Sequence, residues 1–193
     1  MERGQEDRRV RRTKKALEDA LVEQMKMKSI NKISVKDLTE MVDINRGTFY
    51  LHYRDVYDLL EQVEEKIIQD IGDISQIDVF NFSELTQESS FMKIANCLEY
   101  IKERRQIFEV LLSSKGDLQF LERFKTVYRE KFLLNVMKKF EQDSPEFYEY
   151  VSIYMISGAI GIIQEWIKNG MQTSCTSLAN IILNIITRST PTL

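Results

Sequence analysis

The chain has 193 residues, of which 43% are hydrophobic, 30% charged and 10% aromatic, with a formal net charge of −3. Only 7 glycines and 2 prolines occur, too few for the tight turns of sandwiches, barrels and doubly wound sheets, while the apolar content excludes a disordered chain. Two cysteines cannot build a disulfide framework. The longest apolar stretch, 151–163, is shorter than the ~20 residues that a membrane span needs. Residues 1–10 lack the apolar segment of a signal peptide. We therefore expect an all-α, soluble, cytoplasmic protein.

Basic residues concentrate near the N-terminus. Residues 1–54 hold 13 Lys and Arg against 9 Asp and Glu, whereas residues 55–193 hold 14 against 21. Six of the eight residues in 8–15 are basic. This asymmetry predicts an N-terminal part that meets a polyanion, although a solvated tail ahead of a helix would show the same charges.

The first predicted helix spans residues 13–27, where apolar residues recur at the helical period. After a short link, Ser34 and Asp37 have the spacing of a capping box, in which each residue satisfies a backbone N–H of the other. We therefore expect a short second helix to begin just after Ser34. Its apolar face is Val35, Leu38, Met41 and Val42.

A turn and two further helices follow. Asp43 to Asn45 interrupts the second helix, and Asn45 is a good cap for a third helix at about 46–53. Asp55 or Asp58 opens a fourth helix at about 55–71. Residues 72–88 have no clean period and are predicted to connect two parts of the chain. Five more helices are then expected, about nine in all, at roughly 89–103, 104–114, 117–141, 145–170 (capped by Ser144, with Pro145 in the first turn) and 176–188.

Two short helices joined by a three-residue turn match the helix-turn-helix plan, in which the second helix enters the major groove of DNA. Arg46 and Thr48 lie at the start of that helix, where a guanidinium can bind guanine and a hydroxyl can reach a base edge. Gly47 allows close approach of the backbone, and Tyr50 and His52 offer donors for phosphates. An ordinary helical bundle with the same spacing remains an alternative.

Residues 33–60, ISVKDLTEMVDINRGTFYLHYRDVYDLL, closely resemble the N-terminal DNA-binding domain of the tetracycline-repressor (TetR) family of bacterial transcription regulators. The family core G-T-F-Y-x-H-Y is present at residues 47–53. The stretch from residue 13 also looks like the family's first helix, which touches the phosphate backbone at its start. The resemblance and the helix-turn-helix plan together indicate these DNA-binding residues: Thr13, Lys14, Ser34, Val35, Asn45, Arg46, Gly47, Thr48, Tyr50, His52 and Arg54.

Two positions depart from the family pattern. Val42 and Asp43 replace the usual Ala-Gly of the turn, so Asp43 is expected to adopt the left-handed backbone conformation, which Asp tolerates. The lysine common at the start of the family's fourth helix is Val56 here. Arg54 is the nearby cation that we expect to replace its phosphate contact.

Residues 157–171, SGAIGIIQEWIKNGM, are similar to the C-terminal region of regulators of the dihydroxyacetone-kinase type. Family members usually dimerise through their last two long helices. Gly158 and Gly161 would let such helices approach closely, although an intramolecular core would use apolar faces in the same way. The expected dimer interface comprises Val151, Met155, Ile162, Trp166, Ile182 and Ile185.

The C-terminal part is rich in aromatic residues, and family members often bind an effector between these helices. Aromatic residues at helical spacing are also the ordinary content of a core. A cationic ligand would fit if Glu99 or Glu165 points inward, whereas an apolar ligand needs only the aromatics. The expected effector-pocket residues are Phe91, Tyr100, Phe108, Phe124, Tyr128 and Tyr154.

The predicted organisation has three parts: a helix-turn-helix DNA-binding domain at 1–54, a linking helix at 55–72, and a helical effector-binding and dimerisation domain at 73–193. The predicted function is sequence-specific transcriptional regulation, as a repressor, by a homodimer on a palindromic operator in double-stranded DNA. Release by a small-molecule effector is part of this prediction. No cofactor, metal, catalytic residue or membrane contact is expected.

Two other functional classes fit the sequence less well. An enzyme is disfavoured because His52 is the only histidine, and because neither a P-loop nor a dinucleotide-binding glycine motif occurs. A protein-interaction or membrane-surface helical module would use the basic segment 8–15, but that segment has only Val10 as an apolar residue. A redox switch is also disfavoured, since Cys97 lies on an apolar helix and Cys175, expected to be exposed, has no basic neighbour in sequence.

Overall fold

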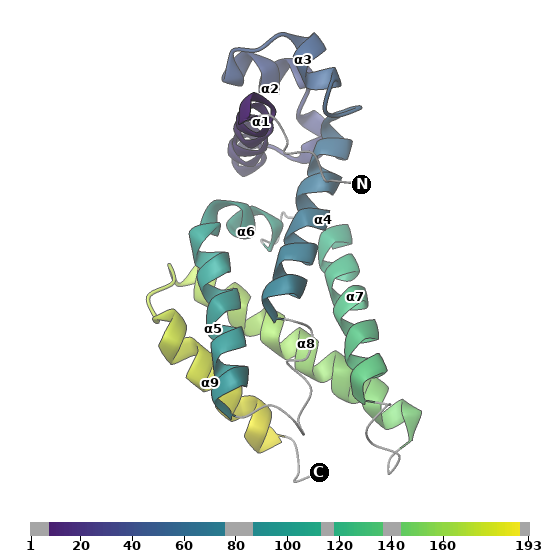
Figure 1. The fold of residues 1–193 in the computed structure, drawn as a ribbon, viewed down its shortest axis with the longest axis vertical. Coiled ribbons are helices and arrows are strands. Elements are labelled where there is room, and N and C mark those ends of the chain that lie inside the picture. Colours follow the sequence, from purple (N-terminus) through teal and green to yellow (C-terminus); the bar gives the residue numbers. More distant parts are fainter. Residues whose placement is uncertain (1–7, 76–86, 113–117, 137–143, 190–193) are drawn as a thin grey trace. The chain divides into compact units, whose positions relative to one another are not determined.

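The computed structural model describes residues 8–75, 87–112, 118–136 and 144–189 (Figure 1). These residues form nine α-helices and one 3₁₀ turn, with no strand among them, so the all-α prediction is confirmed for the described part of the chain. The helices are α1 (Arg8–Met27), α2 (Val35–Val42), α3 (Arg46–Tyr50), α4 (Val56–Ser75), α5 (Gln87–Glu103), α6 (Arg105–Leu111), α7 (Leu118–Val136), α8 (Pro145–Lys168) and α9 (Cys175–Ser189).

The chain divides into two compact units, Met1–Ile67 and Ile68–Leu193, and α4 contributes its first part to one unit and its last part to the other. In the first unit α1 packs on α2, and α2 packs on α3. Its buried apolar side chains come from all four helices and the short links between them. They are Leu17, Ala20, Leu21, Val22, Ile33, Leu38, Phe49, Tyr53, Val56, Leu59, Leu60 and Ile67.

In the second unit α5 lies along α9, α7 lies along α8, and α6 contacts both α5 and α8 (Figure 1). The short helix α6 is buried through Ile107, Phe108, Val110 and Leu111. By length and apolar composition alone α8 could cross a membrane, the one described helix of which this is true. The buried residues that α8 contributes to this unit include Tyr148, Ser152, Ile156 and Trp166.

The turn between α8 and α9 has an unusual backbone. Gly170 and Met171 are both left-handed, with φ of 72° and 57°. The Met171 amide donates to the carbonyl of Trp166 at 2.8 Å, and the Trp166 indole Nε1 donates to the carbonyl of Thr173 at 2.8 Å. Met171 is also buried, with only 9% of its surface exposed. A backbone hydrogen bond, a side-chain hydrogen bond and burial therefore together fix the conformation of this turn.

Several helix limits differ from the predicted ones, among them those of α1, α3 and α4. Helix α1 begins at residue 8 rather than 13, because arginine favours a helix even where no apolar period marks it. Helix α3 ends at Tyr50 rather than near 53. Helix α4 continues through Gly72 to Ser75, whose hydroxyl donates to the Gly72 carbonyl at 3.1 Å. Residues 76–86 of the predicted connection, and the gap between the predicted helices at 104–114 and 117–141, lie outside the described residues.

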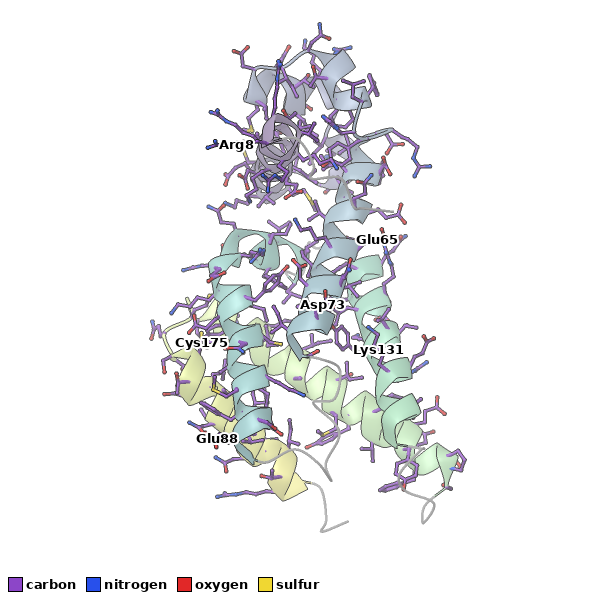
Figure 2. The ribbon with its side chains drawn as sticks, viewed as in Figure 1. Arg8, Glu65, Asp73, Glu88, Lys131 and Cys175 are labelled. Atoms are coloured by element: carbon purple, nitrogen blue, oxygen red, sulfur yellow. The ribbon has the colours of Figure 1, made fainter. Side chains whose placement is uncertain are left out.

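The prediction that Cys175 is exposed is wrong. Cys175 is the first residue of α9 and is 2% exposed (Figure 2 labels it), because α9 packs on α5. Burial raises the pKa of the Cys175 thiol to about 11, helped by the Glu99 carboxylate nearby. Cys97 is half-buried, and burial raises its pKa to about 12.

Candidate nucleic-acid interface

The start of α2 is fixed by a reciprocal pair of hydrogen bonds. The Asp37 amide donates to Ser34 Oγ at 3.2 Å, and the Ser34 amide donates to Asp37 Oδ2 at 2.8 Å. This confirms the predicted capping box. Lys28 Nζ lies 2.9 Å from the same Oδ2. Its hydrogen bond, followed by those from Ser34, lowers the pKa of Asp37 to about 2, so the cap stays ionised at neutral pH.

The turn between α2 and α3 also forms as predicted. Asp43 is left-handed, with φ of 57° and ψ of 51°. The Ile44 amide donates to the Thr39 carbonyl at 3.0 Å, and Asn45 Oδ1 accepts from the Gly47 amide at 2.9 Å, which caps α3. Asp43 therefore replaces the glycine that such a turn commonly uses, and the angle between α2 and α3 is set by local bonds.

Helix α3 has a buried side and an exposed side. Phe49 is 0% exposed and its ring contacts that of Tyr53, with centroids 5.6 Å apart. On the other side Arg46 and Gly47 are exposed, and Tyr50 is 58% exposed. Phe49 therefore anchors α3 in the first unit, so that Arg46, which is predicted to read bases, remains accessible.

The remaining predicted DNA-binding residues lie in several different settings. Ser34 and Asn45 are exposed and serve as helix caps, whereas Val35, Thr48 and His52 are half-buried. On α1, Thr13 and Lys14 are half-buried, and Thr13 Oγ1 donates to the Arg9 carbonyl at 3.0 Å.

Arg54 is held by the first turn of α4. Its amide donates to Asp58 Oδ2 at 2.7 Å, and its guanidinium lies 3.1 Å from Asp58 Oδ1. These bonds lower the pKa of Asp58 and raise that of Arg54. The Arg54 side chain is nonetheless 80% exposed, so a phosphate would have to share or replace its bond to Asp58.

Sequence reasoning missed Leu51 at this surface. It follows α3 and is 79% exposed, more than any other large apolar side chain among the described residues of this unit except Met27. Apolar side chains can contact the methyl group of thymine in the major groove. The signal was present in the sequence, because Leu51 lies two residues after the buried Phe49 and therefore not on its face of the helix.

The predicted dimer-interface residues divide into two groups. Met155, Trp166 and Ile182 are buried within the subunit, whereas Val151 and Ile162 are half-buried and Ile185 is 42% exposed. Other apolar or aromatic side chains of α8 and α9 are exposed instead. These are Phe147 (42%), Tyr150 (65%), Ile153 (40%), Tyr154 (61%) and Ile181 (48%).

An apolar groove of about 310 Å³ lies among α5, α8 and α9. Ile94 and Leu98 of α5 line it, as do Tyr154 and Gly158 of α8 and Ile185 of α9. A Cβ atom added to Gly158 or to Gly161 would meet no atom within 4 Å. This face of the subunit therefore has space that its own side chains do not fill.

Four of the predicted effector-pocket residues form two aromatic pairs beside α4. The Tyr100 and Phe108 rings meet edge to face at 6.1 Å, and Tyr100 donates to Asp70 Oδ2 at 2.8 Å. The Phe124 and Tyr128 rings stack at 4.5 Å.

Tyr128 also donates to the Ile68 carbonyl at 3.1 Å, and burial raises its pKa. Of the other two predicted pocket residues, Phe91 is half-buried and Tyr154 is exposed in the apolar groove. Glu99 and Glu165 are exposed, so neither points inward as a cationic ligand would require. Among the described residues, no three His, Cys, Asp or Glu side chains are placed to hold a metal ion.

Residues 88–188 match a family model described as a transcriptional regulator C-terminal region of the TetR type. The chain is also 27% identical over 119 residues to YxbF, an uncharacterized HTH-type transcriptional regulator of Bacillus subtilis (strain 168). That match covers 61% of this chain and 30% of the relative, so it spans less than a third of the length of the curated protein.

Three solved structures show the same fold. The dihydroxyacetone kinase operon activator DhaS is 19% identical with a TM-score of 0.59, covering 92% of this chain and 95% of that one. A TetR transcriptional regulator from Streptococcus agalactiae 2603V is 20% identical with a TM-score of 0.64, covering 93% and 96%. A TetR-family regulator from Syntrophomonas wolfei is 16% identical with a TM-score of 0.69, covering 95% and 97%.

Proposed function

Because the chain belongs to the TetR family of transcriptional regulators, we propose that it binds a palindromic operator in double-stranded DNA as a homodimer in the cytoplasm. The observation that supports this most is the pair α2 and α3, fixed by local caps, with Phe49 buried and Arg46 exposed at the start of α3. In a helix-turn-helix, this end of the second helix meets base edges in the major groove.

We assign different roles in recognition to the side chains of α3 and to His52, which follows α3. Arg46 binds guanine through its two parallel donors, and Thr48 contacts a neighbouring base. Tyr50 and His52 bind phosphates, which fix the register without specifying sequence. Lys14 adds a phosphate contact from α1.

The test begins with duplexes that the wild-type protein selects from a random-sequence library. On the best selected duplex, Arg46→Ala should cost about 1–3 kcal/mol of binding free energy and flatten the preference at one base position. Lys14→Ala is the matched control, since it should weaken binding to every sequence and lower the salt slope by about one per subunit. Equal loss on all sequences for Arg46→Ala would contradict base reading, and the absence of any selected sequence would contradict the function.

We infer that the second copy of the chain covers the exposed face of α8 and α9. Two-fold symmetry would place two copies of α3 on the two halves of a palindrome. The apolar groove and the exposed Tyr154 and Ile185 support this inference. Ile185→Glu should yield a folded monomer in sedimentation, because Ile185 is exposed within the subunit, whereas Ile182→Glu should also unfold the subunit. A wild-type monomer at micromolar concentration would overturn the inference.

We further propose that an effector binds beside the aromatic pairs and alters DNA affinity through α4. The pairs bond to α4 at Asp70 and Ile68, and α4 belongs in part to each unit. An effector must bind the two states with different affinities, and its coupling with DNA must be reciprocal. Thermal-shift screening of small molecules, with and without a selected duplex, tests this; a ligand that stabilises the protein without altering DNA affinity would be no effector.

We propose repression as the outcome, because a dimer bound over promoter DNA excludes the polymerase. The similar protein DhaS is an operon activator. A separate experiment must therefore distinguish repression of transcription from activation. Run-off transcription from a promoter that contains a selected site should decrease when the protein is added. An increase would show activation instead.

A further inference from the structure

A second groove, which we call the polar groove, lies between α7 and α8 and has a volume of about 240 Å³. Glu122, Lys125, Thr126 and Arg129 line it from α7, at the spacing that places side chains on one face of a helix. The side of α8 that lines it includes Ile153. The volume is below the ~300–1,000 Å³ of sites for drug-sized ligands, so the polar groove suits a small molecule.

The polar groove is separate from the aromatic pairs beside α4. Phe124 and Tyr128 stack on α7, and Tyr128 donates to the Ile68 carbonyl at 3.1 Å. With 3.6 residues per turn, positions 124 and 128 lie on a different face of α7 from positions 122, 125, 126 and 129. A ligand in the polar groove would therefore not occupy the effector site proposed above.

Positive charge exceeds negative charge in the polar groove. Lys125 Nζ lies 2.9 Å from Glu122 Oε1, which neutralises one of the two cations. In the described part of the chain the Arg129 guanidinium has no ion-pair partner. Arg129 lies one helical turn from Lys125, where like charges repel, and both residues are half-buried. A partly desolvated guanidinium without a counter-charge is unfavourable, and a bound anion would relieve this conflict.

The other side chains of the polar groove complement a small organic anion. Thr126 and Ser157 are exposed hydroxyl residues on its two sides, and each hydroxyl can donate a hydrogen bond. A guanidinium presents parallel N–H donors that match the two oxygens of a carboxylate or a phosphate. Ile153, 40% exposed, offers an apolar contact for the carbon skeleton of the ligand.

We propose that the polar groove binds a small molecule that carries a carboxylate or phosphate group. The Arg129 guanidinium pairs with the anionic group, Lys125 adds positive charge, and the hydroxyls of Thr126 and Ser157 provide further hydrogen bonds. All four residues belong to the second unit. The proposal therefore does not depend on DNA binding through α3.

The binding test uses the full chain without DNA and three probes: succinate, inorganic phosphate and the neutral diamide succinamide. Each probe is titrated at constant ionic strength, and the backbone amide resonances are followed by NMR. At least one of the two anions should cause saturable shifts confined to residues 122–129 and 152–157, whereas succinamide should cause none. Comparison of succinate with phosphate identifies the preferred anionic group.

Two substitutions at one exposed position provide a matched pair. Thr126→Glu places a carboxylate three residues from Arg129, where it competes with the ligand, and should raise the Kd of the bound anion about tenfold or more. Thr126→Gln has the same size without the charge and should raise the Kd less than about threefold. Arg129→Gln should also raise the Kd about tenfold or more, whereas Arg188→Gln, at an exposed position of α9, should leave it unchanged. Circular dichroism checks that each variant is folded.

Four results would overturn the proposal. The first is the absence of saturable shifts with either anion, and the second is equal binding of succinamide. The third is an equal loss of affinity in Thr126→Glu and Thr126→Gln, which would show that charge does not govern binding. The fourth is binding by the Ile185→Glu variant but not by the wild-type chain, which would mean that a second copy covers the polar groove. None of these results would alter the proposed binding of DNA, which is measured separately.

Discussion

Replacing Gly158 by alanine should change the stability of the subunit and the stability of the dimer in opposite directions. Gly158 lies inside α8, where glycine is less favourable than alanine, and an added Cβ would meet no atom of the same subunit within 4 Å. The free energy of unfolding of the subunit should therefore rise by about 0.5–1 kcal/mol.

In the proposed dimer the same methyl group would occupy space that a partner helix uses. Inserting one extra carbon into a packed contact costs about 1–3 kcal/mol. At about 1.4 kcal/mol for each factor of ten, the dissociation constant of the dimer should rise roughly 5- to 150-fold.

The two effects can be measured separately. Urea unfolding in the monomeric Ile185→Glu background reports the subunit, and sedimentation equilibrium of the otherwise wild-type chain reports the dimer. Asn96→Ala, at an exposed position of α5, is the control that should stabilise the subunit without changing the dissociation constant. A Gly158→Ala protein with a more stable subunit and an unchanged dissociation constant would refute close approach at this glycine.

Three further outcomes follow from the structure. The Asp37 carboxylate, with its pKa lowered to about 2, stabilises the fold fully above about pH 4 and loses this effect as the pH falls through 2. Melting temperatures of wild type and Asp37→Asn should therefore differ at pH 7 and converge between pH 4 and 2. Phe49→Ala should cost about 3–5 kcal/mol of unfolding free energy by circular dichroism, since Phe49 is 0% exposed. The raised pKa values of Cys97 and Cys175 predict slow labelling by a thiolate-directed reagent at pH 8, and rapid labelling only in guanidinium.

Features that depend on neighbouring residues were predictable from the sequence. The capping box of Ser34 and Asp37, the cap at Asn45 and the left-handed Asp43 all depend on atoms a few residues apart, and the structure confirms each. The cap at Ser144 accepts from the Phe147 amide as expected. Local chemistry of this kind survives tertiary packing because the same hydrogen bonds form in any fold that keeps the helix.

Features that depend on long-range packing were not predictable. Periodicity shows that α9 has an apolar side, but it does not show that Ile182 is buried while Ile185, three residues later, is 42% exposed. The burial of Cys175 depends on α5, which is distant in sequence. Likewise, no local signal marks Met171 as left-handed, because a bulky side chain rarely adopts that conformation.

The fixed turn between α8 and α9 has a consequence for association. With Met171 bonded to Trp166, and Trp166 bonded to Thr173, the connection between the two helices is already ordered in the single subunit. A surface that must order a loop when it binds loses conformational entropy, which weakens the complex. Since this turn has little freedom left to lose, two subunits that meet through α8 and α9 would join largely prearranged surfaces.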